Sequence, residues 1–272
     1  MQFLNLTGPK GAGLTCYILN PRPERSPDRS PRPGILIVPG GAYCENVDHE
    51  QECLALQFMA QGYHAFVLHY AVHREGEPHP GSIPLEQAAW AMALLREKAE
   101  DWNLDPCRLA AAGFSAGGHL AAGLAVHWNK AWLRELTGLT PEQMRPDALI
   151  LGYPVITAGA LTHKETIYHL LGPSPTPEET ELCSLEKQVD AQTPPCFLWT
   201  TQEDELVPPE NTLLFAQACV RNHVPVELHF FPWNRHGLSL ASHETAWDGP
   251  SDDSHEAAWL PLCFRWLEIL FG

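Results

Sequence analysis

Residues 113–117, Gly-Phe-Ser-Ala-Gly, join an apolar run at 109–112 to a segment of helical periodicity that continues through Val126. They match the pattern G-x-S-x-G in the context that this pattern requires, a strand that turns sharply into a helix. Side chains two positions before and after the serine would clash in such a turn, which accounts for both glycines. The turn lifts the Ser115 hydroxyl clear of the sheet and aims a helix N-terminus at developing negative charge. The stretch therefore predicts an exposed nucleophile, with a plain tight turn as the alternative.

Working outward from this unit, the chain alternates apolar runs with segments of helical period. Together with 109–112, the runs at 3–6, 14–19, 35–38, 65–70, 148–153, 196–201 and 226–231 are eight strand candidates. Helical periodicity is clearest at 85–99 and 213–220. Continuous apolar strands alternating with amphipathic helices predict an α/β fold, with a mostly parallel eight-stranded sheet covered by helices on both faces.

The whole chain, residues 1–272, is expected to form a single domain, because α/β sheets of this length commonly share one core. Residues 21–34 hold five prolines and four arginines and predict a surface loop. Residues 157–193, which include the proline-rich run 172–177, predict an irregular insertion that could overhang a site at the carboxyl ends of the strands. No internal repeat is found.

A serine nucleophile needs a base within hydrogen-bond reach, and the base needs a carboxylate that fixes its tautomer. In this kind of fold the acid and then the histidine follow the serine along the chain, each on a loop after a later strand. Asp204 follows the strand candidate 196–201, and His236 follows 226–231 next to a glycine. Glu203 and Glu205 are direct rivals of Asp204, which we favour partly on the resemblance described below.

The loop that follows strand candidate 35–38 reads Pro-Gly-Gly-Ala-Tyr at 39–43. Paired glycines let the backbone turn its N–H groups toward a substrate oxygen, which predicts half of an oxyanion hole at Gly41 and Ala42. The N–H of Ala116 would be the other donor. A common tight turn is the alternative interpretation.

Three residues, Tyr43, His119 and Val207, are the candidates for contact with the substrate. Aromatic side chains near strand ends could stack on sugar rings, or they could belong to the core instead. They are Tyr43, Tyr153, Trp199 and Trp233.

The formal net charge is −16, from 33 acidic and 17 basic side chains. Such a field repels phosphate backbones and anionic membrane surfaces, so neither nucleic acid nor a membrane is an expected partner. No apolar run approaches the roughly 18 to 20 residues of a bilayer crossing. Residues 1–13 lack the features of a secretion signal, which predicts a cytoplasmic location unless a signal was removed. A homo-oligomer remains open.

Eight cysteines are spread along the chain without metal-ligand spacing, and we interpret them as reduced, buried thiols. A group of histidines and acids at 243–255 could be imagined as a metal site, but its spacing fits no helical zinc motif and favours a solvated loop. The sequence predicts neither a metal nor a cofactor.

Five segments together resemble bacterial α/β-hydrolases of the acetyl esterase and xylan esterase group, related to the feruloyl-esterase-like branch. They read PGGAY, GFSAGGHLAA, DALILGYPV, QEDELVPPENTLLFAQA and RHGLSLA, and the resemblance runs from about residue 35 to 270. It implies that Ser115, Asp204 and His236 form a triad, and that Gly41 or Ala42 binds the oxyanion together with Ala116. Pro39 stands where relatives of hormone-sensitive lipase carry histidine, which argues against close kinship with those lipases.

The resulting hypothesis is a serine esterase that hydrolyses acetyl esters, with acetylated sugars or xylo-oligosaccharides as the small-molecule substrate. A general short-chain carboxylesterase, or an amidase or peptidase with the same triad, is the first alternative. The second is a binding protein on this scaffold that has lost catalysis. The sequence does not fix the acyl length or the alcohol half of the substrate.

Overall fold

The computed structural model describes residues 1–22, 30–246 and 255–272. Eight strands form one sheet in the order β1-β2-β4-β3-β5-β6-β7-β8. Strand β2 runs antiparallel to both of its neighbours, and the pairs from β4 to β8 are parallel. The strands are β1 (Gln2–Thr7), β2 (Gly13–Ile18), β3 (Arg32–Val38), β4 (His64–His69), β5 (Leu104–Phe114), β6 (Ala148–Gly152), β7 (Cys196–Thr201) and β8 (Val226–Phe231). The predicted sheet is confirmed.

Ten α-helices lie in the described part of the chain. They are α1 (Glu52–Ala60), α2 (Ile83–Glu97), α3 (Ala99–Trp102), α4 (Ser115–His127), α5 (Ala131–Thr137), α6 (Pro141–Met144), α7 (Lys164–Leu171), α8 (Pro177–Leu182), α9 (Glu210–Arg221) and α10 (Trp259–Phe271). Short 3-10 helices are η1 (Pro9–Gly11), η2 (Asp48–Glu50), η3 (Leu185–Lys187), η4 (His243–Thr245) and η5 (Glu256–Ala258).

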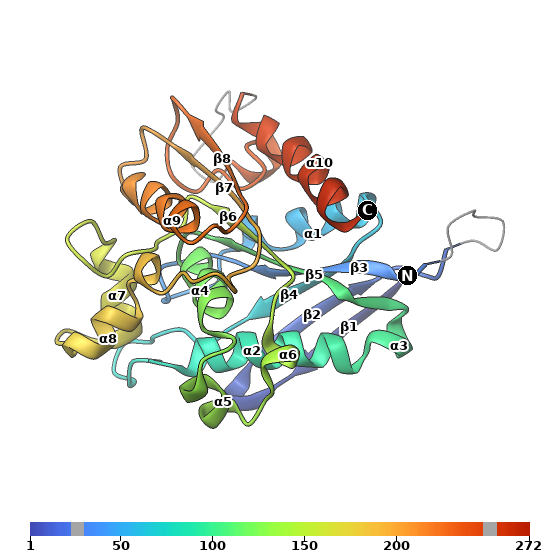
Figure 1. Ribbon diagram of the computed structural model, residues 1–272, viewed down its shortest axis with the longest axis horizontal. Helices are drawn as coiled ribbons and strands as arrows, with labels where there is room; N and C mark the ends of the chain where they lie inside the picture. Colours follow the sequence, from blue (N-terminus) through green and yellow to red (C-terminus); the bar gives the residue numbers. More distant parts are fainter. Residues whose placement is uncertain (23–29, 247–254) are drawn as a thin grey trace.

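Helices cover both faces of the sheet (Figure 1). A hydrophobic core lies on each face. Strand β3 shows how the sequence builds both, because Leu36 and Val38 belong to the core under α2, α4 and α9, whereas Ile35 and Ile37 belong to the core under α1 and α10. Successive side chains of a strand point to opposite faces, so a continuous apolar run supplies both cores. Helices on both faces were predicted and are confirmed.

Two predicted loops differ from the structure in their extent. Residues 157–193 are not irregular throughout, because they contain α7, α8 and η3. Helix α8 begins where Thr176 and Glu179 cap each other's backbone amides around Pro177, a local signal that the proline-rich run concealed.

The loop predicted at 21–34 ends earlier than expected. Strand β3 already begins at Arg32, whose backbone N–H donates to the carbonyl of Asn103 at 2.9 Å. Residues 23–29 of this loop lie outside the described residues.

All eight cysteines are free thiols. Four of them are buried as predicted, Cys16, Cys196, Cys219 and Cys263, whereas Cys44 and Cys107 are exposed. Within residues 1–22, 30–246 and 255–272, no helix is long and apolar enough to cross a membrane.

Candidate active site

Ser115 is the first residue of α4 and lies on a turn with a left-handed backbone, at φ 52°. The two glycines of the turn are sterically required. A Cβ at Gly113 would come within 2.3 Å of the Gly117 carbonyl oxygen, and one at Gly117 within 2.1 Å of the Val38 carbonyl oxygen. The predicted strand-turn-helix unit is therefore present, and the strain at Ser115 is the kind that functional sites store.

Ser115, His236 and Asp204 form a continuous chain of hydrogen bonds. Ser115 Oγ lies 2.7 Å from His236 Nε2, and His236 Nδ1 lies 2.6 Å from Asp204 Oδ2. A carboxylate can only accept at Nδ1, so the neutral imidazole carries its proton there and offers Nε2 to the serine hydroxyl. Three loops far apart in sequence, after β5, β7 and β8, thus bring the three predicted side chains together.

Asp204 is distinguished from its acidic neighbours by its bonds. Its second oxygen, Oδ1, accepts the backbone N–H groups of Leu206 at 3.0 Å and Val207 at 2.8 Å, and its side chain is fully buried. Glu203 instead accepts the backbone N–H of Asn234, and Glu205 is exposed. Neither rival contacts His236 in these bonds, so the geometry favours Asp204 as the histidine's partner.

The loop after β3 has an unusual backbone. Gly41, Ala42 and Tyr43 all have positive φ values, of 117°, 51° and 57°. A Cβ at Gly41 would come within 2.3 Å of the Glu45 carbonyl oxygen, so only glycine fits there. The N–H of Gly40 donates to Glu50 Oε2 at 2.6 Å and is therefore occupied. The amides of Gly41 and Ala42 are thus the loop's candidates for an oxyanion.

Two side chains from other elements hold this loop by its carbonyl groups. The hydroxyl of Tyr70 donates to the Pro39 carbonyl at 2.7 Å, and His169 Nδ1 on α7 lies 2.9 Å from the Ala42 carbonyl. Opposite the loop, Ala116 lies in the first turn of α4, where backbone N–H groups have no partner inside the helix. It is the residue after the nucleophile, the position from which this class of fold donates to the oxyanion.

The three candidates for substrate contact are buried. Tyr43 is 1% exposed, His119 4% and Val207 2%. The Tyr43 hydroxyl lies 3.0 Å from His119 Nδ1, and His119 Nε2 lies 3.0 Å from the Cys183 carbonyl. Burial lowers the pKa of His119 to about 4, so its ring is neutral at pH 7. Val207 acts here through its backbone N–H on Asp204, and contact of these side chains with a substrate stays a prediction.

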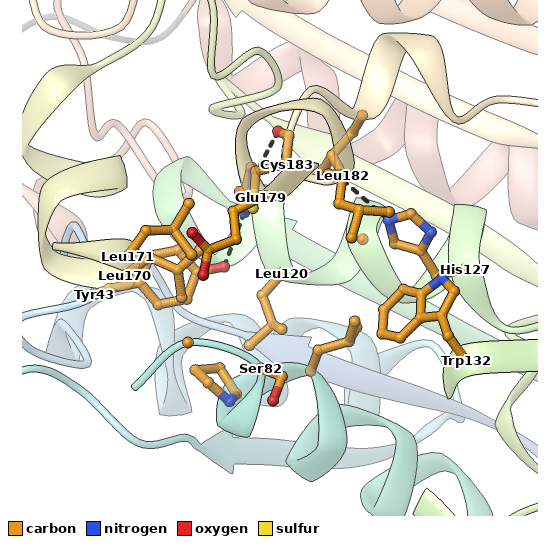
Figure 2. Close-up of a pocket in the computed structure, with 16 residues that line it drawn as sticks. Tyr43, Ser82, Leu120, His127, Trp132, Leu170, Leu171, Glu179, Leu182 and Cys183 are labelled. Atoms are coloured by element: carbon orange, nitrogen blue, oxygen red, sulfur yellow. Dashed lines mark hydrogen bonds between the residues drawn. The ribbon is translucent and has the colours of Figure 1, made fainter. Parts of the chain in front are cut away.

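Tyr43 and His119 line a mostly apolar cavity of about 260 Å³ between α2, α4, α7 and α8. Figure 2 shows Tyr43, Leu170 and Leu171 on one side of it and His127 and Trp132 on the other. Ser115 is not among its lining residues. The cavity is therefore separate from the nucleophile, and Tyr43 is the residue that the cavity and the oxyanion loop share.

Of the aromatic residues named as sugar-stacking candidates, Tyr153 and Trp199 belong to the core and are 1% and 0% exposed. Trp233, on the loop that leads to His236, is 58% exposed. Sequence reasoning missed the role of Glu50, which is 1% exposed and bonded to Gly40. No local signal marks it, because its sequence neighbours Asp48, His49, Gln51 and Glu52 are polar as well.

Within the described residues, no group of three or more histidine, cysteine, aspartate or glutamate side chains is arranged to hold a metal ion. Part of the 243–255 segment, residues 247–254, lies outside the described residues.

A serine on a strand-turn-helix unit, followed in chain order by an aspartate and a histidine on later loops of a mainly parallel sheet, defines the α/β-hydrolase class. Within this class the chain belongs to the BD-FAE family, whose sequence model matches residues 23–219.

Known relatives are similar over most of this chain. The endo-1,4-beta-xylanase B of Butyrivibrio fibrisolvens is 41% identical over 222 residues, which are 79% of this chain. The chain spans 34% and 46% of the lengths of the two curated relatives that it matches.

Solved structures match the whole fold. The acetyl ester-xyloside bifunctional hydrolase of Caldicellulosiruptor lactoaceticus has a TM-score of 0.81 at 37% identity, covering 97% of this chain and 89% of that one. A carboxylesterase of Lactobacillus plantarum has a TM-score of 0.87 at 30% identity, covering 98% of this chain and 97% of that one.

Proposed function

We propose that this protein is a serine esterase that removes acetyl and other short acyl groups from sugars or xylo-oligosaccharides. The observation that carries the proposal is the hydrogen-bond chain from Ser115 through His236 to Asp204, at 2.7 and 2.6 Å. Serine becomes a useful nucleophile near neutral pH only beside such an oriented base. Membership of the BD-FAE family supports the same chemistry.

In the first half of the reaction, Ser115 Oγ attacks the ester carbonyl carbon while His236 Nε2 takes the hydroxyl proton. The carbonyl oxygen gains negative charge and is stabilised by the amides of Ala116 and of Gly41 or Ala42. The bond to the alcohol oxygen then breaks, and His236 returns the proton to that oxygen. The products are a free alcohol and an acyl group on Ser115.

In the second half, a water molecule attacks the acyl carbon and gives its proton to His236. The bond between the acyl carbon and Ser115 Oγ breaks, and His236 returns the proton to the serine. Asp204 keeps its charge throughout and stabilises the imidazolium that forms twice in each cycle. The carboxylic acid leaves, and the enzyme is regenerated without a metal or cofactor in the cycle.

The preference for acetylated sugars rests on the relatives. One similar structure is named as an acetyl ester-xyloside hydrolase, and one similar sequence as a xylanase. On the molecule itself, exposed Trp233 adjoins the loop of His236 and offers an apolar ring face of the kind on which sugars stack.

A substrate panel tests this proposal. Acetate release from acetylated xylo-oligosaccharides is compared with hydrolysis of p-nitrophenyl acetate and of a peptide anilide, and the Ser115→Ala variant serves as the control. We expect kcat/KM to be highest for the acetylated sugar and the anilide to remain intact. Wild-type protein that releases acetate no faster than the control would contradict the proposal.

A general short-chain carboxylesterase is the second candidate, favoured by the similarity to a Lactobacillus plantarum carboxylesterase along 98% of this chain. It predicts equal or higher kcat/KM for simple aryl esters than for acetylated sugars. Failure of a fluorophosphonate probe to label Ser115 would instead favour a binding protein that has lost catalysis.

A further inference from the structure

Glu50, the last residue of η2, lies buried directly beneath the oxyanion loop. Its Oε2 accepts the N–H of Gly40 at 2.6 Å, and its Oε1 accepts the hydroxyl of Tyr153 at 2.7 Å. A Cβ at Gly40 would lie 2.8 Å from Glu50 Oε2 and 2.9 Å from Ser115 Cβ, so the carboxylate, the loop and the nucleophile pack around one point. A buried carboxylate is tolerated because both of its oxygens have donors.

Tyr153 extends this contact to the loop that carries the histidine. Its hydroxyl accepts the backbone N–H of Ser239 at 2.8 Å while it donates to Glu50. The Tyr153 ring also packs edge-on against the His236 ring, with centroids 4.9 Å apart. Glu50 and Tyr153 therefore connect the loop after β3 with the loop after β8.

The neighbouring residue of η2 makes a second contact with the histidine loop. The hydroxyl of Ser239 donates to the carbonyl of His49, and the Ser239 carbonyl accepts the indole N–H of Trp259 at 2.9 Å. Ser239 has a left-handed backbone, at φ 51°, and is fully buried. Three groups of one residue are thus fixed three positions after His236.

We infer that Glu50 is a positioning residue for the esterase site, which holds the oxyanion loop and the histidine loop in register through Gly40 and Tyr153. This inference rests on the proposed function. The Gly40 N–H donates to buried Glu50 and so points away from the substrate. The N–H groups of Gly41 and Ala42 then remain to face the substrate oxygen. Those amides bind the oxygen most strongly when it is charged, so their alignment matters in the transition state more than in the ground state.

Three variants separate the two arms of the contact. Glu50→Ala removes both acceptors. Tyr153→Phe removes the hydroxyl that joins Glu50 to Ser239 and keeps the bond between Glu50 and Gly40. Glu50→Gln can still accept from Gly40 through its amide oxygen. With p-nitrophenyl acetate, we expect kcat to fall about 10²-fold for Glu50→Ala, the size of one lost oxyanion donor, with KM nearly unchanged. Glu50→Gln and Tyr153→Phe should each lose about 10-fold, since each keeps the bond to Gly40.

Asp147→Asn is the matched control. Asp147 is also a largely buried carboxylate that accepts a backbone N–H, that of Leu109 at 3.0 Å. It directly precedes β6 and so lies at the amino end of that strand, away from the loops that carry the triad. Its variant should lower the melting temperature and leave kcat unchanged for the folded protein. This comparison distinguishes a positioning role from a general loss of stability.

The second-order rate of fluorophosphonate labelling of Ser115 is measured in parallel, and it should fall in the same order as kcat. This rate does not depend on the natural ester. Wild-type protein that labels rapidly but hydrolyses no acetyl ester would refute the proposed function while the labelling ratios still test Glu50. If Glu50→Ala does not fold, the kcat values and labelling rates of Glu50→Gln and Tyr153→Phe test the inference instead. Folded variants whose kcat and labelling rate stay within twofold of wild type would overturn the inference.

Discussion

The nucleophile turn and the oxyanion loop lie side by side, yet they are held in different ways. The turn at Ser115 is marked by its own sequence, because the close backbone approach at Gly113 and Gly117 admits only glycine at these two positions. The loop after β3 is fixed from outside, by Glu50, Tyr70 and His169 from three other parts of the chain. A short sequence motif therefore reveals the nucleophile turn. It does not reveal the conformation of the loop after β3, which depends on side chains far away in the sequence.

The largest expected effect is at the nucleophile turn. Ser115→Ala should lower kcat on the order of 10⁶-fold, the loss seen when a triad serine is removed. The backbone should be undisturbed, because the substitution only removes the hydroxyl and leaves both glycines of the turn in place. Initial rates with p-nitrophenyl acetate and a thermal melt measure both. A loss of only a few-fold would mean that Ser115 is not the nucleophile.

Asp204→Asn should be next, with kcat lower by about 10⁴-fold, because the amide cannot hold His236 in the tautomer that accepts the serine proton. Glu203→Gln is the paired control and should stay within about twofold of wild type, as expected of a surface change that leaves the base untouched. If Glu203→Gln lowered kcat more than Asp204→Asn, Glu203 and not Asp204 would be the acid of the triad.

The externally held loop should respond more mildly. His169→Ala removes one of the side chains that hold it, and we expect kcat to fall about 10-fold, less than for the loss of a whole oxyanion donor. His169→Asn, which can still donate to the Ala42 carbonyl, is the rescue variant. Equal activity of all three proteins would show that α7 does not position the loop.

The last prediction concerns stability and leaves the reaction rate aside. Burial lowers the pKa of His64, His119 and His127 to about 4 each. In the unfolded chain they take up protons near pH 6.5, so the free energy of unfolding should be constant above that value and fall between about pH 6.5 and 4.

For His119 alone the loss is on the order of 3 kcal/mol across that range. Urea denaturation at pH 7.5, 5.5 and 4.5 measures it, and His119→Gln should give a shallower dependence. A free energy that rises on acidification would contradict the assignment of these buried rings as neutral.

The same contrast explains how much the sequence could predict. All eight strands follow from short apolar runs, and the positions of Ser115 and His236 follow from one motif and a chain order. The choice of Asp204 over Glu203 and Glu205 also needed the family resemblance. Strand β5 is longer than predicted, Leu104–Phe114 and not 109–112, because it pairs with β3 at both ends across Pro106. Pairing partners are not visible in a single segment.

The misses share a physical cause. Nothing near Glu50 in the sequence shows that its carboxylate will meet Gly40 and Tyr153, since this contact depends on how β3 and β6 are placed in the sheet. The exposure of Tyr43 and Val207 likewise depends on three-dimensional packing, which buries both, and their contact with a substrate stays a prediction.

The loop after β7 carries three consecutive acidic residues, of which the middle one, Asp204, is buried and the other two are exposed. Asp204 accepts two backbone amides on one oxygen and contacts the imidazole with the other, so both of its oxygens have partners. Its short side chain lies in the interior, while Glu203 and Glu205 are exposed. A loop can therefore be rich in negative charge and still present a single, unambiguous anion to its histidine.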